Sequence, residues 1–279
     1  MQHDTDPFSL FPYRAIVDHP PVVWPNGARV AVWIVPNIEH FHIEFGAGAP
    51  DIRNHSRRDY GKRVGVWRVM EVLEKNGVRG TVALNGEIGK YYPRIMQTAI
   101  DMHWEFMGHG LTNSITLRGM PREQEVSVIA QTKGVIEGYG QRWLGPSLAE
   151  TDATLDLLRA NGVEYVADWV NDDLPYRMSN GLYSIPYTIE LNDIPLFNTP
   201  SIAAEEFYRK ICETIDVLYD EAAASGRVMC IALHPFLIGV PHRIRYLDKA
   251  LLQYIASHGN IWFSTGHEII QAYREQEKK

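Results

Sequence analysis

Cysteine, positive charge and long apolar runs are scarce in this chain, and each scarcity excludes a class of protein. The two cysteines among 279 residues cannot build a disulfide framework and form no C-x-x-C pair, so a reducing compartment fits best. A net charge of -7 leaves no basic surface, and we expect neither nucleic acid nor a membrane as a partner. No apolar run is long enough to cross a bilayer.

The first residues also lack the features of a secretory signal. Residues 1–7 are acidic, and prolines follow at positions 12, 20 and 21, so neither a cationic start nor an apolar segment is present. We therefore expect a cytoplasmic protein. Residues 1–27 predict an irregular arm that ends in the turn Pro25-Asn26-Gly27, because proline and glycine interrupt regular structure.

Residues 28–279 predict a single α/β domain, since no linker, repeat or low-complexity tract divides them. Hydrophobic residues make up 45% of the chain, enough for a core. Apolar runs of strand length alternate with segments in which apolar residues recur every three or four positions, which favours a mostly parallel sheet, curled or closed. The predicted strands are 29–36, 80–84, 105–107, 165–168, 228–233 and 261–263. The predicted helices are 63–76, 92–102, 121–137, 147–162, 207–218, 244–255 and a last one after residue 265. Two of them are expected to begin with a capping box, formed by Ser147 and Glu150 in the first case and by Thr265 and Glu268 in the second.

Polar residues follow the carboxyl ends of several of these strands. In open and closed α/β sheets those ends meet at one edge, where substrates bind. Pro235 cannot donate a ladder hydrogen bond, so the strand before it ends and leaves His234 at that edge. The strand-end segments are Asn37-Ile38-Glu39-His40, Gly108-His109, Asp168-Trp169-Val170-Asn171-Asp172-Asp173 and His234.

These segments resemble the motifs of the polysaccharide deacetylase (carbohydrate esterase 4) superfamily. That family has a distorted (β/α) barrel and a Thr-Phe-Asp-Asp motif whose first Asp is the base. The second Asp and the two histidines of a His-Ser/Thr-x-x-His motif hold a divalent metal, and a late Leu-His-Pro motif supplies the acid. The resemblance implies the same single-domain barrel over residues 28–279, with Glu39 as the base, His234 as the acid and His109 as a third catalytic residue.

The metal-ligand positions of that family are occupied here by His40, His109 and Asn113, which are two imidazoles and an amide. Imidazoles bind zinc well, but a hydrolytic zinc site usually has three protein ligands, and an amide is a poor third ligand. Two alternatives stay open. Either one divalent metal such as zinc is bound by these residues, with Glu39 as a substitute third ligand, or no metal is bound and imidazolium or backbone N–H groups stabilise the oxyanion.

Longer motifs resemble the allantoinase-like and cyclic imide hydrolase branch of the superfamily. This resemblance implies a homo-oligomeric hydrolase that opens cyclic amides, imides or ureides by attack of a base-activated water on a small-molecule substrate. The alternatives are a metal-dependent carbohydrate N-deacetylase and a non-catalytic relative that binds a small molecule. The matching segments are 59–65, 104–110, 168–176 and 233–239.

Ring opening needs a base, a stabiliser for the oxyanion and a proton for the departing nitrogen. We expect burial at a strand end to raise the pKa of Glu39 toward the working pH; the alternative role of Glu39 is an ion pair with Arg58 or Arg63. The predicted substrate contacts are hydrogen bonds that Asp168, Asp172 and Asp173 accept from ring N–H groups, and a flat pocket lined by Trp143 and Trp169. For Asp172 and Asp173 a turn before Pro175 is the alternative.

Overall fold

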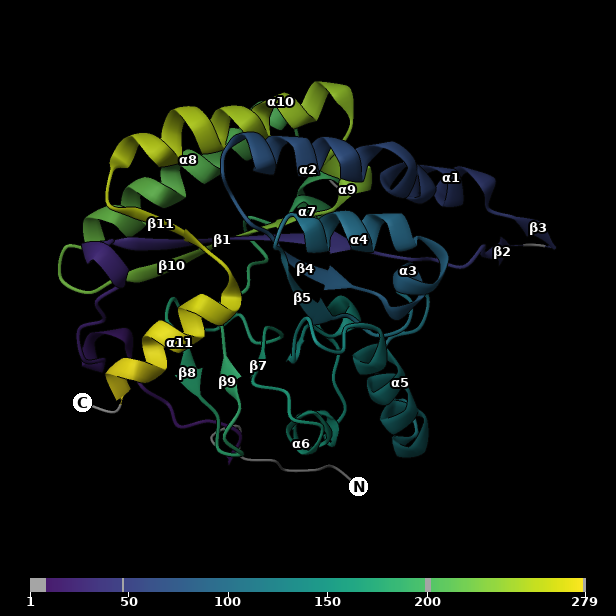
Figure 1. The fold of residues 1–279 in the computed structure, drawn as a ribbon, viewed down its shortest axis with the longest axis horizontal. Coiled ribbons are helices and arrows are strands. Elements are labelled where there is room, and N and C mark those ends of the chain that lie inside the picture. The colour runs from purple at the N-terminus through teal and green to yellow at the C-terminus, as the bar shows by residue number, and fades with distance from the viewer. Residues whose placement is uncertain (1–8, 47, 199–201, 278–279) are drawn as a thin grey trace.

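The computed structural model describes residues 9–46, 48–198 and 202–277. Helices pack around one large sheet (Figure 1). The strands are β1 (Val30–Ile38), β2 (Phe45–Gly46), β3 (Ala49–Pro50), β4 (Thr81–Leu84), β5 (Glu105–Gly108), β6 (Arg142–Trp143), β7 (Tyr165–Val166), β8 (Tyr176–Arg177), β9 (Tyr183–Ser184), β10 (Arg227–Leu233) and β11 (Ile261–Ser264). The α-helices are α1 (Ile52–Tyr60), α2 (Val66–Lys75), α3 (Gly86–Tyr91), α4 (Pro93–Asp101), α5 (Arg122–Val135), α6 (Thr154–Ala160), α7 (Asp193–Asn198), α8 (Ala204–Glu221), α9 (Pro235–Ile238), α10 (Pro241–Lys249) and α11 (Gly266–Glu277).

The sheet is mostly parallel and curled, as the alternation of strand and helix predicts. Its order is β10-β1-β4-β5-β6-β7-β9-β8, and β11 also pairs with β1. Every pairing in it is parallel except that of β8 with β9. The strands β1, β4, β5 and β10 therefore present their carboxyl ends at one edge. No helix in the described part of the chain is long and apolar enough to cross a membrane.

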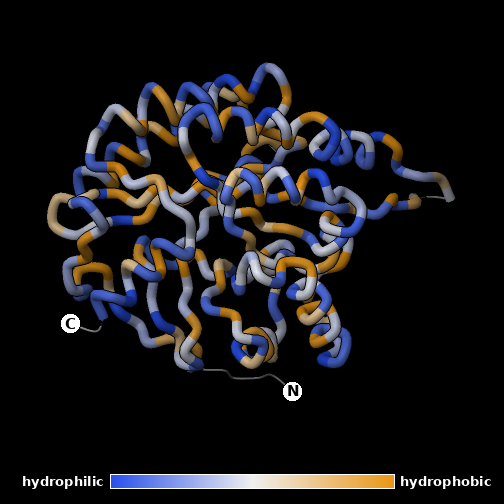
Figure 2. The backbone as a smooth tube through the Cα atoms, in the orientation of Figure 1, coloured by the Kyte–Doolittle hydropathy of each residue, from blue (hydrophilic) through white to orange (hydrophobic). Residues whose placement is uncertain are grey.

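Strand β1 is buried along its whole length and divides the core in two. Its side chains alternate between the faces of the sheet. Val32 and Ile34 pack into the cluster formed with α2, α8 and α10, whereas Trp33 and Val35 face the cluster that includes Tyr165 and α11. Figure 1 shows α2, α8 and α10 on one side of the sheet and α11 on the other. The outer helices alternate between hydrophobic and hydrophilic segments in Figure 2, as amphipathic helices do.

The helix expected over 63–76 is the last part of a longer helical segment. It begins with α1 and passes through one π-turn, Gly61–Gly65, before α2. A Cβ atom at Gly65 would collide with the carbonyl group of Pro235. Because glycine has no side chain, this turn can pack directly against α9, the short helix that follows His234.

One of the two predicted capping boxes forms and the other does not. The backbone N–H of Thr265 donates to Glu268 at 2.9 Å, and that of Glu268 donates to Thr265 Oγ1 at 3.4 Å, which confirms the box that opens α11. The box predicted at Ser147 and Glu150 is wrong, because Ser147 lies at a φ of 61° in a short 3-10 turn. Helix α6 starts only at Thr154.

Candidate active site

The structure brings Glu39, His109 and His234 together at the carboxyl edge of the sheet. Glu39 follows β1, and its Oε1 lies 3.5 Å from His109 Nε2 and 3.4 Å from His234 Nε2. Asn113 donates its Nδ2–H to the same oxygen at 2.5 Å. Glu39, His109 and His234 are all buried. The cluster is thus one carboxylate oxygen surrounded by two imidazoles and an amide.

Asp193 lies directly behind His234. Its Oδ1 accepts from His234 Nδ1 at 2.6 Å, and its Oδ2 accepts from the backbone N–H of His234 at 2.8 Å. Asp193 is completely buried and begins α7, beside the end of β10, where Asn192 bridges to Ala232. No pattern in the sequence pointed to this residue, because it belongs to no predicted strand end. His234 is therefore held between two carboxylates.

This position determines the charge of His234. Burial alone would lower its pKa, but the charges of Glu39 and Asp193 and their hydrogen bonds raise the pKa of His234 to about 10. The imidazole is accordingly protonated at neutral pH, and both ring nitrogens are donors. One points at Asp193 and the other toward Glu39.

The expectation of a raised pKa for Glu39 is wrong. Burial does raise it, but the positive charge on His234 and hydrogen bonds from His109 and His234 outweigh burial and lower the pKa of Glu39 to about 2. The alternative of an ion pair with Arg58 or Arg63 is not seen either, since Arg58 pairs with Glu44 and Arg63 with Asp59. Glu39 is therefore ionised at neutral pH, opposite a cationic His234.

His109 is oriented by the peptide group between Leu144 and Gly145. A carbonyl oxygen only accepts, so His109 Nδ1 is the donor in its 2.6 Å hydrogen bond to Leu144 O. The N–H of the same peptide group, on Gly145, donates to Asp168 Oδ1 at 2.6 Å. Asp168 thus lies behind His109, one peptide group away, in the position of a support for the imidazole.

Asp168 is one member of a buried carboxyl pair. Burial raises the pKa of Asp168 well above its usual range, and the nearby charge of Glu150 raises it further. Burial also raises the pKa of Glu150 to about 7, although its interactions with Asp168 and Trp169 act to lower it. The two carboxyl groups therefore share a proton at neutral pH.

Of the metal ligands expected from the family, His109 and Asn113 meet at Glu39, whereas His40 lies beside Glu87. His40 turns away, with its Nε2 3.6 Å from Glu87 Oε2. The amide of Asn113 is held by two hydrogen bonds, since its Nδ2 donates to Glu39 and its Oδ1 accepts from Asn85 Nδ2 at 2.9 Å. These residues do not fit a metal ion at the Glu39 cluster, so no catalytic step is assigned to one.

Asp172 and Asp173 lie far from Glu39. The carbonyl of Asp173 accepts from Val228 N–H at the beginning of β10, whereas His234 follows the end of that strand. Six residues of strand separate the two points by about 20 Å. Asp172 closes a turn by accepting from Leu174 N–H at 2.9 Å. Within one subunit these two aspartates do not contact a small substrate held by Glu39.

The two tryptophans expected to line a flat pocket pack against protein. Trp143 is 2% exposed and lies so close to Gly108 that a Cβ atom there would come within 3.0 Å of its ring. Trp169 packs edge-on against Phe11 of the N-terminal arm, with ring centroids 5.2 Å apart. Both pack into a further hydrophobic cluster around α6, which includes Leu155 and Leu158.

The fold and this cluster define an α/β barrel of the deacetylase type with a buried carboxylate and two histidines at the strand ends. The family model of the polysaccharide deacetylases matches residues 58–166. A Schizosaccharomyces pombe protein described as a polysaccharide deacetylase is 26% identical, with 90% of this chain and 92% of that protein covered.

Solved structures agree with this assignment. A Pseudomonas aeruginosa PAO1 protein described as a polysaccharide deacetylase has a TM-score of 0.83 at 25% identity, with 94% of this chain and 98% of that chain covered. PuuE allantoinase has a TM-score of 0.83 at 24% identity, with 92% of this chain and 94% of that chain covered. These matches support the assignment of the chain to the polysaccharide deacetylase superfamily.

Proposed function

We propose that this protein is a hydrolase that opens cyclic amides, imides or ureides at a C–N bond. The observation that carries the proposal is the arrangement of Glu39 Oε1 within 3.5 Å of two imidazole nitrogens, with Asp193 behind His234. Membership of the superfamily supports hydrolysis of an amide C–N bond, and the structural likeness to an allantoinase supports a cyclic substrate.

In the proposed reaction Glu39 orients a water molecule and accepts its proton as the water oxygen attacks the ring carbonyl carbon. The carbonyl π electrons move to oxygen, where the imidazolium of His234 stabilises the negative charge, and His109 adds an Nε2–H donor when both of its ring nitrogens carry a proton. The C–N bond then breaks, and its electron pair takes the proton of His234 Nε2. The proton held by Glu39 returns to His234 and restores the starting state.

With a pKa of about 2, Glu39 is a weak base. This low pKa holds as long as His234 is charged. Once His234 gives up its proton, the positive charge that lowers the pKa of Glu39 is gone. The two transfers together convert a charged pair into a neutral carboxylic acid and a neutral imidazole. Burial favours that neutral pair, so the water-activating step and the protonation of nitrogen assist each other.

The ligand geometry favours this reaction over metal-dependent sugar deacetylation. A deacetylase of that type needs three ligands around one ion, whereas His40 lies with Glu87 and the Asn113 oxygen accepts from Asn85. Glu39, His109 and His234 provide base, oxyanion donor and acid without an added group.

The experiment measures ring opening of succinimide, phthalimide, dihydrouracil, hydantoin and allantoin, beside acetate release from chito-oligosaccharides. The matched variants are Glu39→Gln and Glu44→Gln, the second on an exposed glutamate that pairs with Arg58. We expect turnover of at least one ring, with kcat reduced about 10²–10⁴-fold in Glu39→Gln and unchanged in Glu44→Gln. Acetate release with no ring turned over, or full activity of Glu39→Gln, would overturn the proposal.

A further inference from the structure

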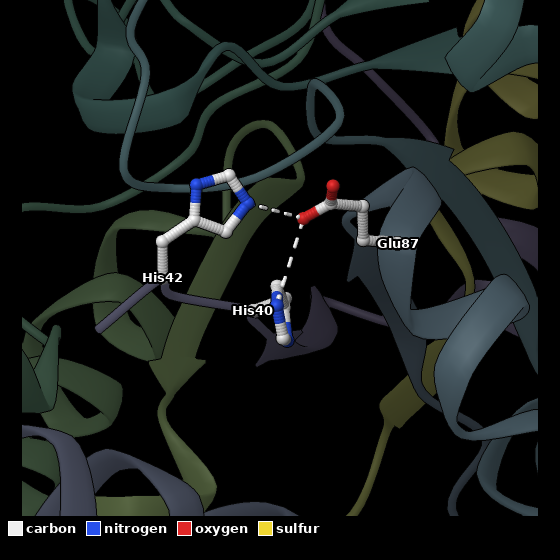
Figure 3. A group of neighbouring side chains, drawn as sticks. All are labelled: His40, His42 and Glu87. Atoms are coloured by element: carbon white, nitrogen blue, oxygen red, sulfur yellow. Dashed lines mark hydrogen bonds and ion pairs between the residues drawn. The ribbon is translucent and has the colours of Figure 1, made fainter.

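A second group of ligand-type side chains lies beside the Glu39 cluster but is not part of it. It consists of His40, His42 and Glu87 (Figure 3). Glu87 Oε2 lies 2.9 Å from His42 Nε2 and 3.6 Å from His40 Nε2. One atom from each residue lies within 4.8 Å of both others. Figure 3 shows both imidazoles directed at the same carboxylate oxygen.

The backbone explains why these side chains meet. His40 and His42 are two residues apart in the segment without regular structure after β1, and their ring centroids lie 5.6 Å apart. Glu87 stands in the first turn of α3, at the neighbouring strand β4. The ring of His40 packs against Tyr91 and Tyr92, with centroids 5.5 and 5.8 Å away. The imidazole is therefore held in place by contacts that do not depend on Glu87.

The spacing suits a small transition-metal ion. Zinc bonds of 2.0–2.1 Å at tetrahedral angles place neighbouring donor atoms about 3.3 Å apart, and the distances of 2.9 and 3.6 Å lie on either side of that value. Two imidazoles and one carboxylate favour zinc, cobalt or nickel over magnesium and calcium, which prefer oxygen ligands. His42 is 48% exposed at its side chain, so solvent can reach the ion.

We propose that His40, His42 and Glu87 bind one divalent transition-metal ion that joins the segment after β1 to the start of α3. The site uses none of the residues assigned to the reaction. Lys62, which is buried, and His55 also interact electrostatically with His40, and the positive charge of Lys62 weakens metal binding without blocking the ligand atoms. The bound metal stabilises the segment after β1, beside the active site, and takes no part in proton transfer.

The test is calorimetric titration of Zn²⁺ into chelator-treated full-length protein, with the absorption spectrum of bound Co²⁺ as a second readout. We expect one ion per chain, a rise in Tm, and an absorption spectrum that indicates a low coordination number for the bound Co²⁺. His42→Ala and Glu87→Gln should each weaken binding about 10–100-fold or more. The matched control is His242→Ala, on an exposed histidine of α10, which should bind as the unchanged protein does.

Binding that is absent, or that persists equally in His42→Ala and Glu87→Gln, would overturn the metal site. Circular dichroism of both variants excludes unfolding as the cause of a loss. Ring-opening activity is measured separately on the chelator-treated protein. A protein that binds no ion but opens rings therefore contradicts the metal site and not the proposed hydrolysis. A protein that binds one ion but opens no ring contradicts the hydrolysis and not the metal site.

Discussion

Replacement of Asp193 by asparagine tests whether His234 acts as a cationic acid. The pKa of His234 is raised to about 10 from an ordinary 6.5, which corresponds to about 5 kcal/mol in favour of the imidazolium. Glu39 and Asp193 each contribute one charge and one hydrogen bond to this effect. Loss of the Asp193 charge should therefore remove roughly half of it, on the order of 2.5 kcal/mol.

The assay is the pH dependence of kcat/KM for a ring-opening substrate. The alkaline limb is the fall of kcat/KM at high pH, and its midpoint gives the pKa of the catalytic acid in the free enzyme. Because Glu39 and His234 titrate together, this pKa is a property of the pair. We expect this limb near pH 10 in the unchanged protein, as the pKa of His234 indicates, and lower by about two pH values in Asp193→Asn. At pH 9 the variant should then lose on the order of tenfold in kcat/KM, whereas at pH 6 it should lose much less.

The same substitution should also destabilise the fold. Asp193 accepts two hydrogen bonds from His234, one at each oxygen, and asparagine offers only one acceptor oxygen. One buried donor is left facing an NH₂ group, which costs about 1–3 kcal/mol in the free energy of unfolding. Urea unfolding measures this cost.

The control is Asp216→Asn, because Asp216 accepts from His258 Nε2 at 2.9 Å on the outer surface of α8. It should leave the alkaline limb in place. An alkaline limb that stays near pH 10 in a folded Asp193→Asn protein would refute the reasoning, and so would a limb near pH 7 in the unchanged protein.

Two further predictions concern stability. The pKa of Glu150 in the folded protein is raised to about 7. Between about pH 4.5 and 7 the folded state therefore keeps a proton that the unfolded chain has released. The free energy of unfolding falls as the pH rises through this range. Glu150→Gln should reduce this fall by up to about 3 kcal/mol between pH 5 and pH 8; equal pH slopes in urea unfolding would contradict the shared proton. Gly65→Ala should cost about 1–3 kcal/mol or more and lower kcat, because the added methyl group meets the Pro235 carbonyl beside His234. Gly134→Ala in α5 is the control, since nothing lies within 4 Å of its Cβ position, and equal Tm values for the two variants would contradict the packing argument.

The strands and their polar ends were predictable because they depend on local sequence. Residues 30–35 and 228–233 are continuous apolar runs, which is typical of strands buried on both faces, and the structure pairs them in parallel. Pro235 marks the end of the second run. Since parallel strands align their carboxyl ends, the sequence predicted that Glu39, His109 and His234 lie at one edge of the sheet. The strand order that makes them neighbours comes from the structure.

The ionisation of the cluster was not predictable in the same way. The sequence indicated that Glu39 would be buried, and burial alone raises the pKa of a carboxyl group. The actual pKa of about 2 depends on the distances of 3.4 and 3.5 Å to two imidazoles. A sequence does not contain those distances.

By itself the sequence determined the class of fold and the three residues at the centre of the cluster, because hydrophobic runs and a proline stop act over a few neighbouring residues. Only the tertiary structure decided which groups surround them. Asp193 reaches His234 across 41 residues, and His40 turns from His109 to Glu87. Electrostatic and hydrogen-bond partners depend on proximity in space, which arises only when the sheet curls and the loops at its edge pack together.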